Sequence, residues 1–164
     1  MSSTEPNRPD TNREPQGDAP DADERLLEWH AVLPGALVGL VVLVAASLVG
    51  ALLDRNLADY DHSAWRYPLF VVVLVGYASA GFVAGRRAPS GALSNGAVAG
   101  ILAFALWVPI RILIWAVRDE HKGLFTGSSP VLRPGQIFGH LVIASALGML
   151  GGFIGARLVV KRVQ

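Results

Sequence analysis

The sequence predicts an all-α integral membrane protein, a bundle of four transmembrane helices. The first observation is the stretch at residues 92–117, which is almost wholly apolar and has Arg111 as its one charged residue. A helix of about 20 apolar residues crosses the hydrocarbon core of a bilayer, so this stretch is long enough to span it. The second is the composition, 52% hydrophobic against 16% charged residues, which is typical of membrane rather than globular proteins. Three further apolar stretches complete the pattern.

Residues 1–25 form a polar tail ahead of the first apolar stretch. The tail is rich in proline and acidic residues and has almost no large apolar side chain. Such a segment cannot bury enough surface to offset its ordering entropy, so it is predicted to be disordered. A solvated arm is the simpler interpretation, and a docking segment for a partner is the alternative. Residues 26–164 then make up the transmembrane domain.

The first two spans are predicted at residues 31–53 and 67–85, and both are uncharged. Pro34 lies near the beginning of the first span, where a missing backbone N–H has little effect on the helix. Trp65 and Tyr67 lie at the beginning of the second span, and such aromatic side chains suit the headgroup level of a bilayer.

The third and fourth spans are predicted at residues 92–117 and 135–160. A tight basic turn at residues 86–91 leads into the third span. The connection at residues 118–133 is the longest, and its glycines and prolines break any regular structure. Four spans place both termini on the same side of the membrane.

The distribution of lysine and arginine predicts the orientation, because cations near the ends of spans favour the cytoplasmic side. The set on the side of the termini is Arg13, Arg25, Arg86, Arg87, Arg157, Lys161 and Arg162. The set on the other side is smaller: Arg55, Arg66, Arg118, Lys122 and Arg133. We therefore expect a bacterial cytoplasmic membrane protein with cytoplasmic termini. Five of the inner cations would also favour anionic lipid headgroups: Arg86, Arg87, Arg157, Lys161 and Arg162.

Glycines at four-residue spacing occur in every span. They expose a flat backbone surface on which another helix can approach closely. The predicted helix-packing glycines are Gly35, Gly39, Gly81, Gly85, Gly96, Gly100, Gly148, Gly151, Gly152 and Gly155. All lie in the cytoplasmic half, so the bundle is expected to be narrow there. The outer half has larger side chains, and it is either filled or open as an outward-facing cavity.

The two halves of the chain contain similar segments. Residues 34–40 (PGALVGL) resemble residues 95–101 (NGAVAGI), and residues 81–86 (GFVAGR) resemble residues 152–157 (GFIGAR). Two parallel helical hairpins related by a pseudo-twofold axis along the membrane normal, an arrangement known in transporters, would explain this similarity. Chance similarity between glycine-rich helices is the alternative.

The glycine-rich hairpin also carries a family resemblance. Residues 81–87 (GFVAGRR), a short turn and then residues 95–100 (NGAVAG) resemble small, uncharacterised four-span bacterial membrane proteins of the YrzE-like kind. The resemblance extends over roughly residues 30–160. The long acidic tail and the longer third connection depart from it. It implies the four-span fold and no activity.

Arg111 is the candidate functional residue, because a charge within a span is expensive and is often functional. Trp107 and Trp115 lie four residues to either side, where a ring could cover the guanidinium group. His140 has a comparable depth in the fourth span, so Arg111 and His140 could line a site for an anion. A snorkelling arginine is the simpler interpretation. A salt bridge to Asp119 or Glu120 is the third.

Other chemistry has little support. Without cysteine, the chain has neither disulfides nor a catalytic thiol. Asp59, Asp61 and His62 more plausibly belong to a solvated loop than to a metal site. No catalytic or phosphate-binding motif is present, so we expect no enzyme activity, cofactor, metal or nucleic-acid partner.

The function expected from these features is that of a small structural or accessory membrane protein acting through helix–helix association, with its glycine faces as the association surfaces. Its partners would be the lipid bilayer and either a second copy or a larger membrane complex. The alternative is a small oligomeric transporter or channel with an outward-facing site near Arg111 and His140. Because no aspartate or glutamate lies within a predicted span, the first function is favoured over proton-coupled transport.

Overall fold

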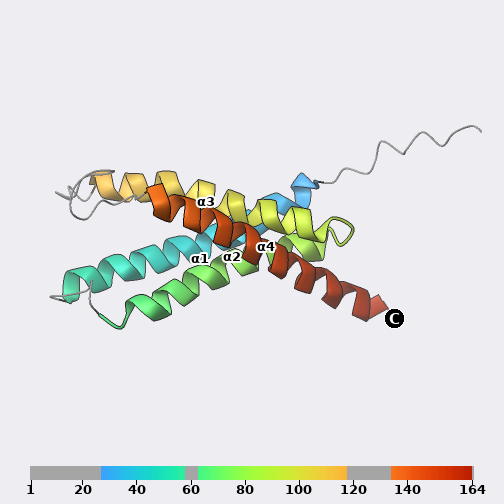
Figure 1. Cartoon of the computed structure of the whole chain (residues 1–164), viewed down its shortest axis with the longest axis horizontal. Coiled ribbons are helices and arrows are strands. Elements are labelled where there is room, and N and C mark those ends of the chain that lie inside the picture. Colours follow the sequence, from blue (N-terminus) through green and yellow to red (C-terminus); the bar gives the residue numbers. More distant parts are fainter. Residues whose placement is uncertain (1–26, 58–62, 118–133, 164) are drawn as a thin grey trace, which may run out of the picture.

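The structure, a computed structural model, describes residues 27–57, 63–117 and 134–163. Four helices account for almost all of them: α1 (Trp29–Asn56), α2 (Arg66–Arg87), α3 (Ala92–Val117) and α4 (Pro134–Val163). They pack as a bundle (Figure 1), which confirms the predicted all-α, four-helix architecture. Several sequence predictions lie outside the described residues: the tail at 1–25, the loop cluster of Asp59, Asp61 and His62, and the acids Asp119 and Glu120.

Each helix contains its predicted span and, except for α3, extends slightly beyond it. The extensions of α1 are polar, because Asp54, Arg55 and Asn56 continue the helix after the apolar stretch ends. Hydropathy detects where a helix leaves the apolar phase, whereas backbone hydrogen bonding decides where it ends. Pro34 and Pro109 are accommodated within α1 and α3.

The four helices form two hairpins, α1–α2 and α3–α4, which pack against each other. Helix α2 contacts all three other helices, and so does α3, whereas α1 and α4 barely touch. Helices α1 and α4 therefore lie at opposite corners of a rhombic bundle. A strict pseudo-twofold axis between the two hairpins would pair the α2–α3 contact with an equal contact between α1 and α4. This second contact is almost absent, so the symmetry of the two hairpins is incomplete.

Both hairpins use the same ladder of small residues. In the first, Gly35 of α1 faces Ala80 and Ala84 of α2. In the second, Gly96 of α3 faces Gly148 and Gly152 of α4. In the structure, Ala84 is thus the counterpart of Gly152. In the sequence match of residues 81–86 with residues 152–157, the counterpart of Gly152 is Gly81. The two alignments therefore differ by about one helical turn.

Between the hairpins, α2 and α4 approach most closely through glycine. A Cβ atom built on Gly81 would overlap the carbonyl oxygen of Gly148, and one on Gly85 would overlap that of Gly152. All ten glycines predicted for helix packing face a neighbouring helix of the same chain in this way. Because glycine within a helix is otherwise unfavourable, these positions are explained by backbone contacts that no side chain would allow.

The substitution Gly81→Ala tests this packing against a matched control. We expect Gly81→Ala to lower the free energy of unfolding by about 1–3 kcal/mol, because the added methyl group forces α2 and α4 apart. The same change at Gly139, where a Cβ atom would meet no neighbouring atom, should raise it by about 0.5–1 kcal/mol. Unfolding in mixed detergent micelles, followed by circular dichroism, measures both. Equal effects would contradict the close approach.

Candidate functional site

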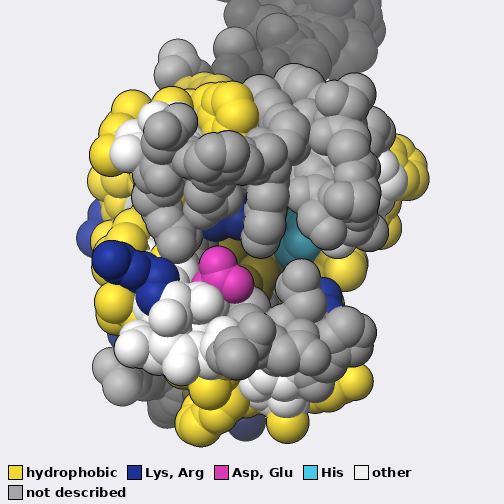
Figure 2. Space-filling view, turned by 90° about the vertical axis from the view of Figure 1, so that its left-hand side faces the viewer, with side chains coloured by type: hydrophobic (Ala, Val, Ile, Leu, Met, Phe, Trp, Pro, Cys, Tyr) yellow, Lys and Arg dark blue, Asp and Glu magenta, His cyan; other side chains and the backbone are white. Residues whose placement is uncertain are grey.

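Burial divides the bundle into two halves. The tight half is at the end with the α2–α3 turn, and the loose half is at the end with the α1–α2 and α3–α4 connections. The buried residues of α2 begin at Gly76, those of α3 end at Phe104, and those of α4 begin at Ala144. Towards the α1–α2 and α3–α4 connections, the helices diverge (Figure 1). Viewed from that end, acidic, basic and histidine side chains lie beside a hollow that has hydrophobic side chains at its floor (Figure 2).

At the boundary between the two halves, His140 of α4 forms a hydrogen bond with Tyr77 of α2. The Tyr77 hydroxyl lies 3.3 Å from His140 Nδ1, and the direction of the bond depends on the tautomer. Tyr77 is almost completely buried, at 1% exposure, so without this bond its hydroxyl would lie unsatisfied in an apolar environment. The pair therefore fixes α4 to α2 just where the glycine contacts end.

Aromatic rings enclose the imidazole of His140. Phe104 of α3 stacks on it with ring centroids 5.8 Å apart and planes at 12°. Phe70 and Tyr77 of α2 meet it edge-on, at 6.5 and 6.3 Å. Such offset and edge-to-face contacts add to the stabilisation from burial. His140 is thus held in a defined position by two helices.

Trp107 continues this arrangement across the bundle to α1. Its ring stacks with Phe104 at 6.0 Å, and its Nε1–H donates a hydrogen bond of 2.8 Å to the hydroxyl of Ser47. Ser47 in turn donates to the backbone carbonyl of Leu43 at 2.8 Å. We call Ser47, Tyr77, Phe104, Trp107 and His140 the aromatic cluster. It connects all four helices.

Arg111 is separate from the aromatic cluster. It is half-buried on α3, one turn beyond Trp107 towards the loose end. Among the residues that the structure describes, Arg111 makes neither an ion pair nor a ring contact, and the polar partner of His140 is Tyr77. Trp115 is also half-buried. The structure thus brings two of the four predicted ligand-binding residues together, Trp107 and His140, with Phe104 between them.

Three members of this cluster were not predicted from the sequence: Ser47, Tyr77 and Phe104. Tyr77 is the one that could have been found. A signal was available, because tyrosines of membrane helices usually lie at the interface, whereas Tyr77 lies in the middle of the second span. A phenol at that depth needs a hydrogen-bond partner from another helix. The nearby histidine of the fourth span was the candidate to supply it.

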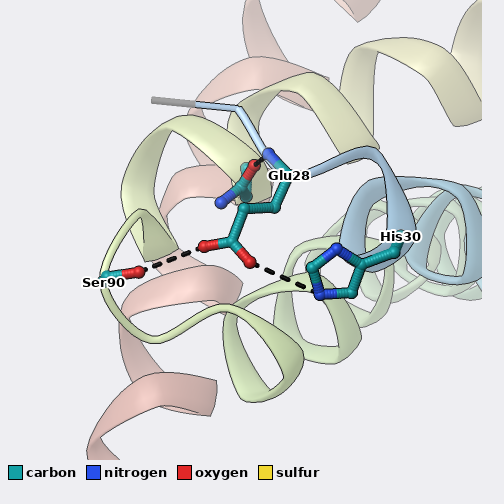
Figure 3. A network of polar contacts seen from close by, with 4 residues as sticks. Glu28, His30 and Ser90 are labelled. Carbon is teal, nitrogen blue, oxygen red and sulfur yellow. Dashed lines mark hydrogen bonds and ion pairs between the residues drawn. The ribbon is translucent and has the colours of Figure 1, made fainter. Parts of the chain in front are cut away.

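A second set of polar contacts lies at the opposite, tight end of the bundle (Figure 3). Asn95 of α3 is fully buried, and its side-chain oxygen accepts a 2.7 Å hydrogen bond from the backbone N–H of Glu28. Ser90, in the α2–α3 turn, donates to Glu28 Oε1 at 3.1 Å. His30 Nε2 lies 3.4 Å from Glu28 Oε2. These contacts tie the beginning of α1 to the α2–α3 turn.

The predicted basic residues gather at this same end. Arg86 and Arg157 lie over the rings of Phe82 and Phe153, with the guanidinium carbon 5.7 and 4.2 Å from the ring centroids. Arg87 and Lys161 are exposed. The side chain of Arg162 lies outside the described part of the chain. The cations therefore flank the tight end, away from the hollow and from Arg111.

These features together define the class of protein. All four helices are long and apolar enough to cross a membrane, and large hydrophobic side chains are exposed along each of them. Water would disfavour such a surface, whereas lipid matches it, so the chain is a multi-pass membrane protein. Comparisons with protein-family models, with curated proteins and with solved structures found no match. The relation to YrzE-like proteins therefore stays a prediction.

Replacing Tyr77 by phenylalanine isolates the hydrogen bond to His140. We expect Tyr77→Phe to lower the free energy of unfolding in mixed micelles by about 0.6 kcal/mol, the average for hydrogen bonds between membrane helices, and by at most about 1.7 kcal/mol. The same change at Tyr67, which is 77% exposed, serves as the control and should have almost no effect. If both variants are as stable as the parent, the pair does not hold α2 and α4 together.

Proposed function

We propose that the chain is a small structural or accessory protein of the bacterial cytoplasmic membrane, without catalytic activity. It acts by associating with a second copy or with a larger membrane complex. The observation that carries this proposal is the packing of the tight half. There the backbones of α2 and α4 meet at Gly81 and Gly148, which leaves no room for a passage between these helices. A rigid bundle closed at one end suits a scaffold better than a pore.

Association has to use the lipid-facing surface. The ten packing glycines, expected from the sequence to be association surfaces, are occupied by helices of the same chain. Large side chains remain on the outside, among them Val41 of α1 and Val142 of α4, which are 68% and 51% exposed. Because α1 and α4 lie at opposite corners, each offers a face that the rest of the chain does not cover.

Single cysteines test this association, since the chain has none of its own. A photoactivatable cross-linker is attached to a cysteine at Val41 or Val142 in bacterial membranes. We expect cross-linked products larger than the monomer from at least one of these positions. A cysteine at the buried Ala80 is the control and should give none. A monomer at every exposed position would contradict the proposal.

The alternative is a small oligomeric transporter or channel with an outward-facing site near Arg111 and His140. The hollow at the loose end favours it (Figure 2). Two features count against it: His140 is already bonded to Tyr77, and the tight half is closed. Solute flux into proteoliposomes that is lost in His140→Ala, but kept in Tyr67→Phe, would favour the transporter over the scaffold.

The proposed orientation has its own test, a matched pair of serine substitutions. Ser63 precedes α2 and Ser90 lies in the α2–α3 turn, at opposite ends of the bundle. With cytoplasmic termini, Ser63→Cys should react with a membrane-impermeant maleimide in spheroplasts, whereas Ser90→Cys should react only after permeabilisation. The reverse pattern would place the termini outside.

A further inference from the structure

A cavity of about 590 Å³ lies between the α2–α3 turn, the first turn of α3 and the C-terminal part of α4. Helix α4 continues past the start of α3 at this end (Figure 1), which leaves a wedge between the two helices. We call this cavity the interfacial pocket. The interfacial pocket is separate from the aromatic cluster, because none of the residues that line the pocket belongs to that cluster.

The interfacial pocket combines an apolar wall with two cations. Pro89, Leu93, Phe153 and Val160 supply the apolar surface, and Arg157 and Lys161 supply the charges. Arg157 and Lys161 lie one turn apart on α4. Neither forms an ion pair with any acid that the structure describes.

The guanidinium of Arg157 is held in place within this pocket. Its carbon lies 4.2 Å from the centroid of the Phe153 ring, a distance at which the ring attracts the cation. This contact occupies a face of the guanidinium group and leaves its N–H donors, which lie in the plane of the group, for an anion.

The serine hydroxyls of the pocket cannot replace these cations as donors. Ser90 donates its proton to Glu28 Oε1, and Ser94 donates to the backbone carbonyl of Gly91. An anion in the pocket would therefore depend on Arg157 and Lys161 for its charge-assisted hydrogen bonds.

The depth of the pocket indicates which anion it suits. The apolar stretch of α4 ends at Lys161, and α2 ends at Arg86 and Arg87 at the same end of the bundle. Phe153 thus faces the acyl-chain region, while Lys161 reaches the headgroup level. A ligand that fits both parts of the wall has an acyl chain and a phosphate. A free anion would leave the apolar wall unused.

We propose that the interfacial pocket binds one anionic phospholipid, with its phosphodiester held by Arg157 and Lys161 and an acyl chain along Phe153 and Val160. This site does not depend on the proposed association of whole chains. It assigns to two of the basic residues a specific ligand, beyond the general attraction of cations to a negatively charged membrane surface.

Native mass spectrometry of the full chain in detergent tests the site, with phosphatidylglycerol as the probe and phosphatidylcholine of the same acyl chains as the comparison. We expect one phosphatidylglycerol to be retained in preference to phosphatidylcholine. Arg157→Gln and Lys161→Gln should each weaken this binding about fivefold, from the loss of one cation near the lipid surface.

Arg86→Gln is the matched control, since Arg86 also lies over a phenylalanine four residues earlier but does not line the pocket. It should leave binding unchanged. If Arg86→Gln weakens binding as much as Arg157→Gln, the attraction is only that of surface charge and the site is refuted.

A further variant separates the cavity from its charges. Ala156 lines the pocket, so Ala156→Phe fills it while both cations remain, and it should abolish the preference for phosphatidylglycerol. Inorganic phosphate distinguishes a lipid from a free anion. If millimolar phosphate displaces the lipid, or if Ala156→Phe binds as the parent does, the proposal is overturned.

Discussion

The close approach of α2 and α4 at glycine is the constraint on which the rest of the bundle depends. Lipid tails are as apolar as leucine, so helices in a membrane gain little by hiding apolar side chains from the solvent. They gain instead from dispersion contacts and from hydrogen bonds, and both require short distances. Gly81 and Gly85 allow α2 to meet the backbone of α4 at Gly148 and Gly152. A side chain at any of these positions would separate the hairpins.

The loose half follows from the tight half. Helices that cross at an angle diverge away from the point where they meet. Here they diverge towards the α1–α2 and α3–α4 connections (Figure 1). Larger side chains then make the contacts between helices, and the aromatic cluster lies where the glycine contacts stop. The hydrogen bonds of Tyr77 with His140 and of Trp107 with Ser47 join helices that glycine no longer holds together. The bundle thus changes from backbone packing to side-chain packing along its length.

The sequence predicted the four spans and the two hairpins, but not which helices of the two hairpins pack against each other, for a physical reason. Hydropathy depends on the residues of one helix, so the four apolar stretches were visible without any knowledge of the fold. A glycine at position 81 shows that some helix approaches, but its identity depends on crossing angles and loop lengths. The depth of His140 was likewise readable, whereas its partner Tyr77 depends on the rotation of α2 about its own axis. The charge of Arg111 marked it as the candidate functional residue, but a charge alone does not predict what the side chain contacts.

The bond from Asn95 to the start of α1 has a consequence for biogenesis. The first hairpin leaves the ribosome before α3, and Gly35 and Gly39 can meet α2 at once because both partners already exist. The amide of Glu28 receives its acceptor only after Asn95 has been synthesised. The backbone N–H of Glu28 therefore stays without this acceptor until the third span has been made, so one contact at the beginning of the earliest helix depends on the synthesis of a later one.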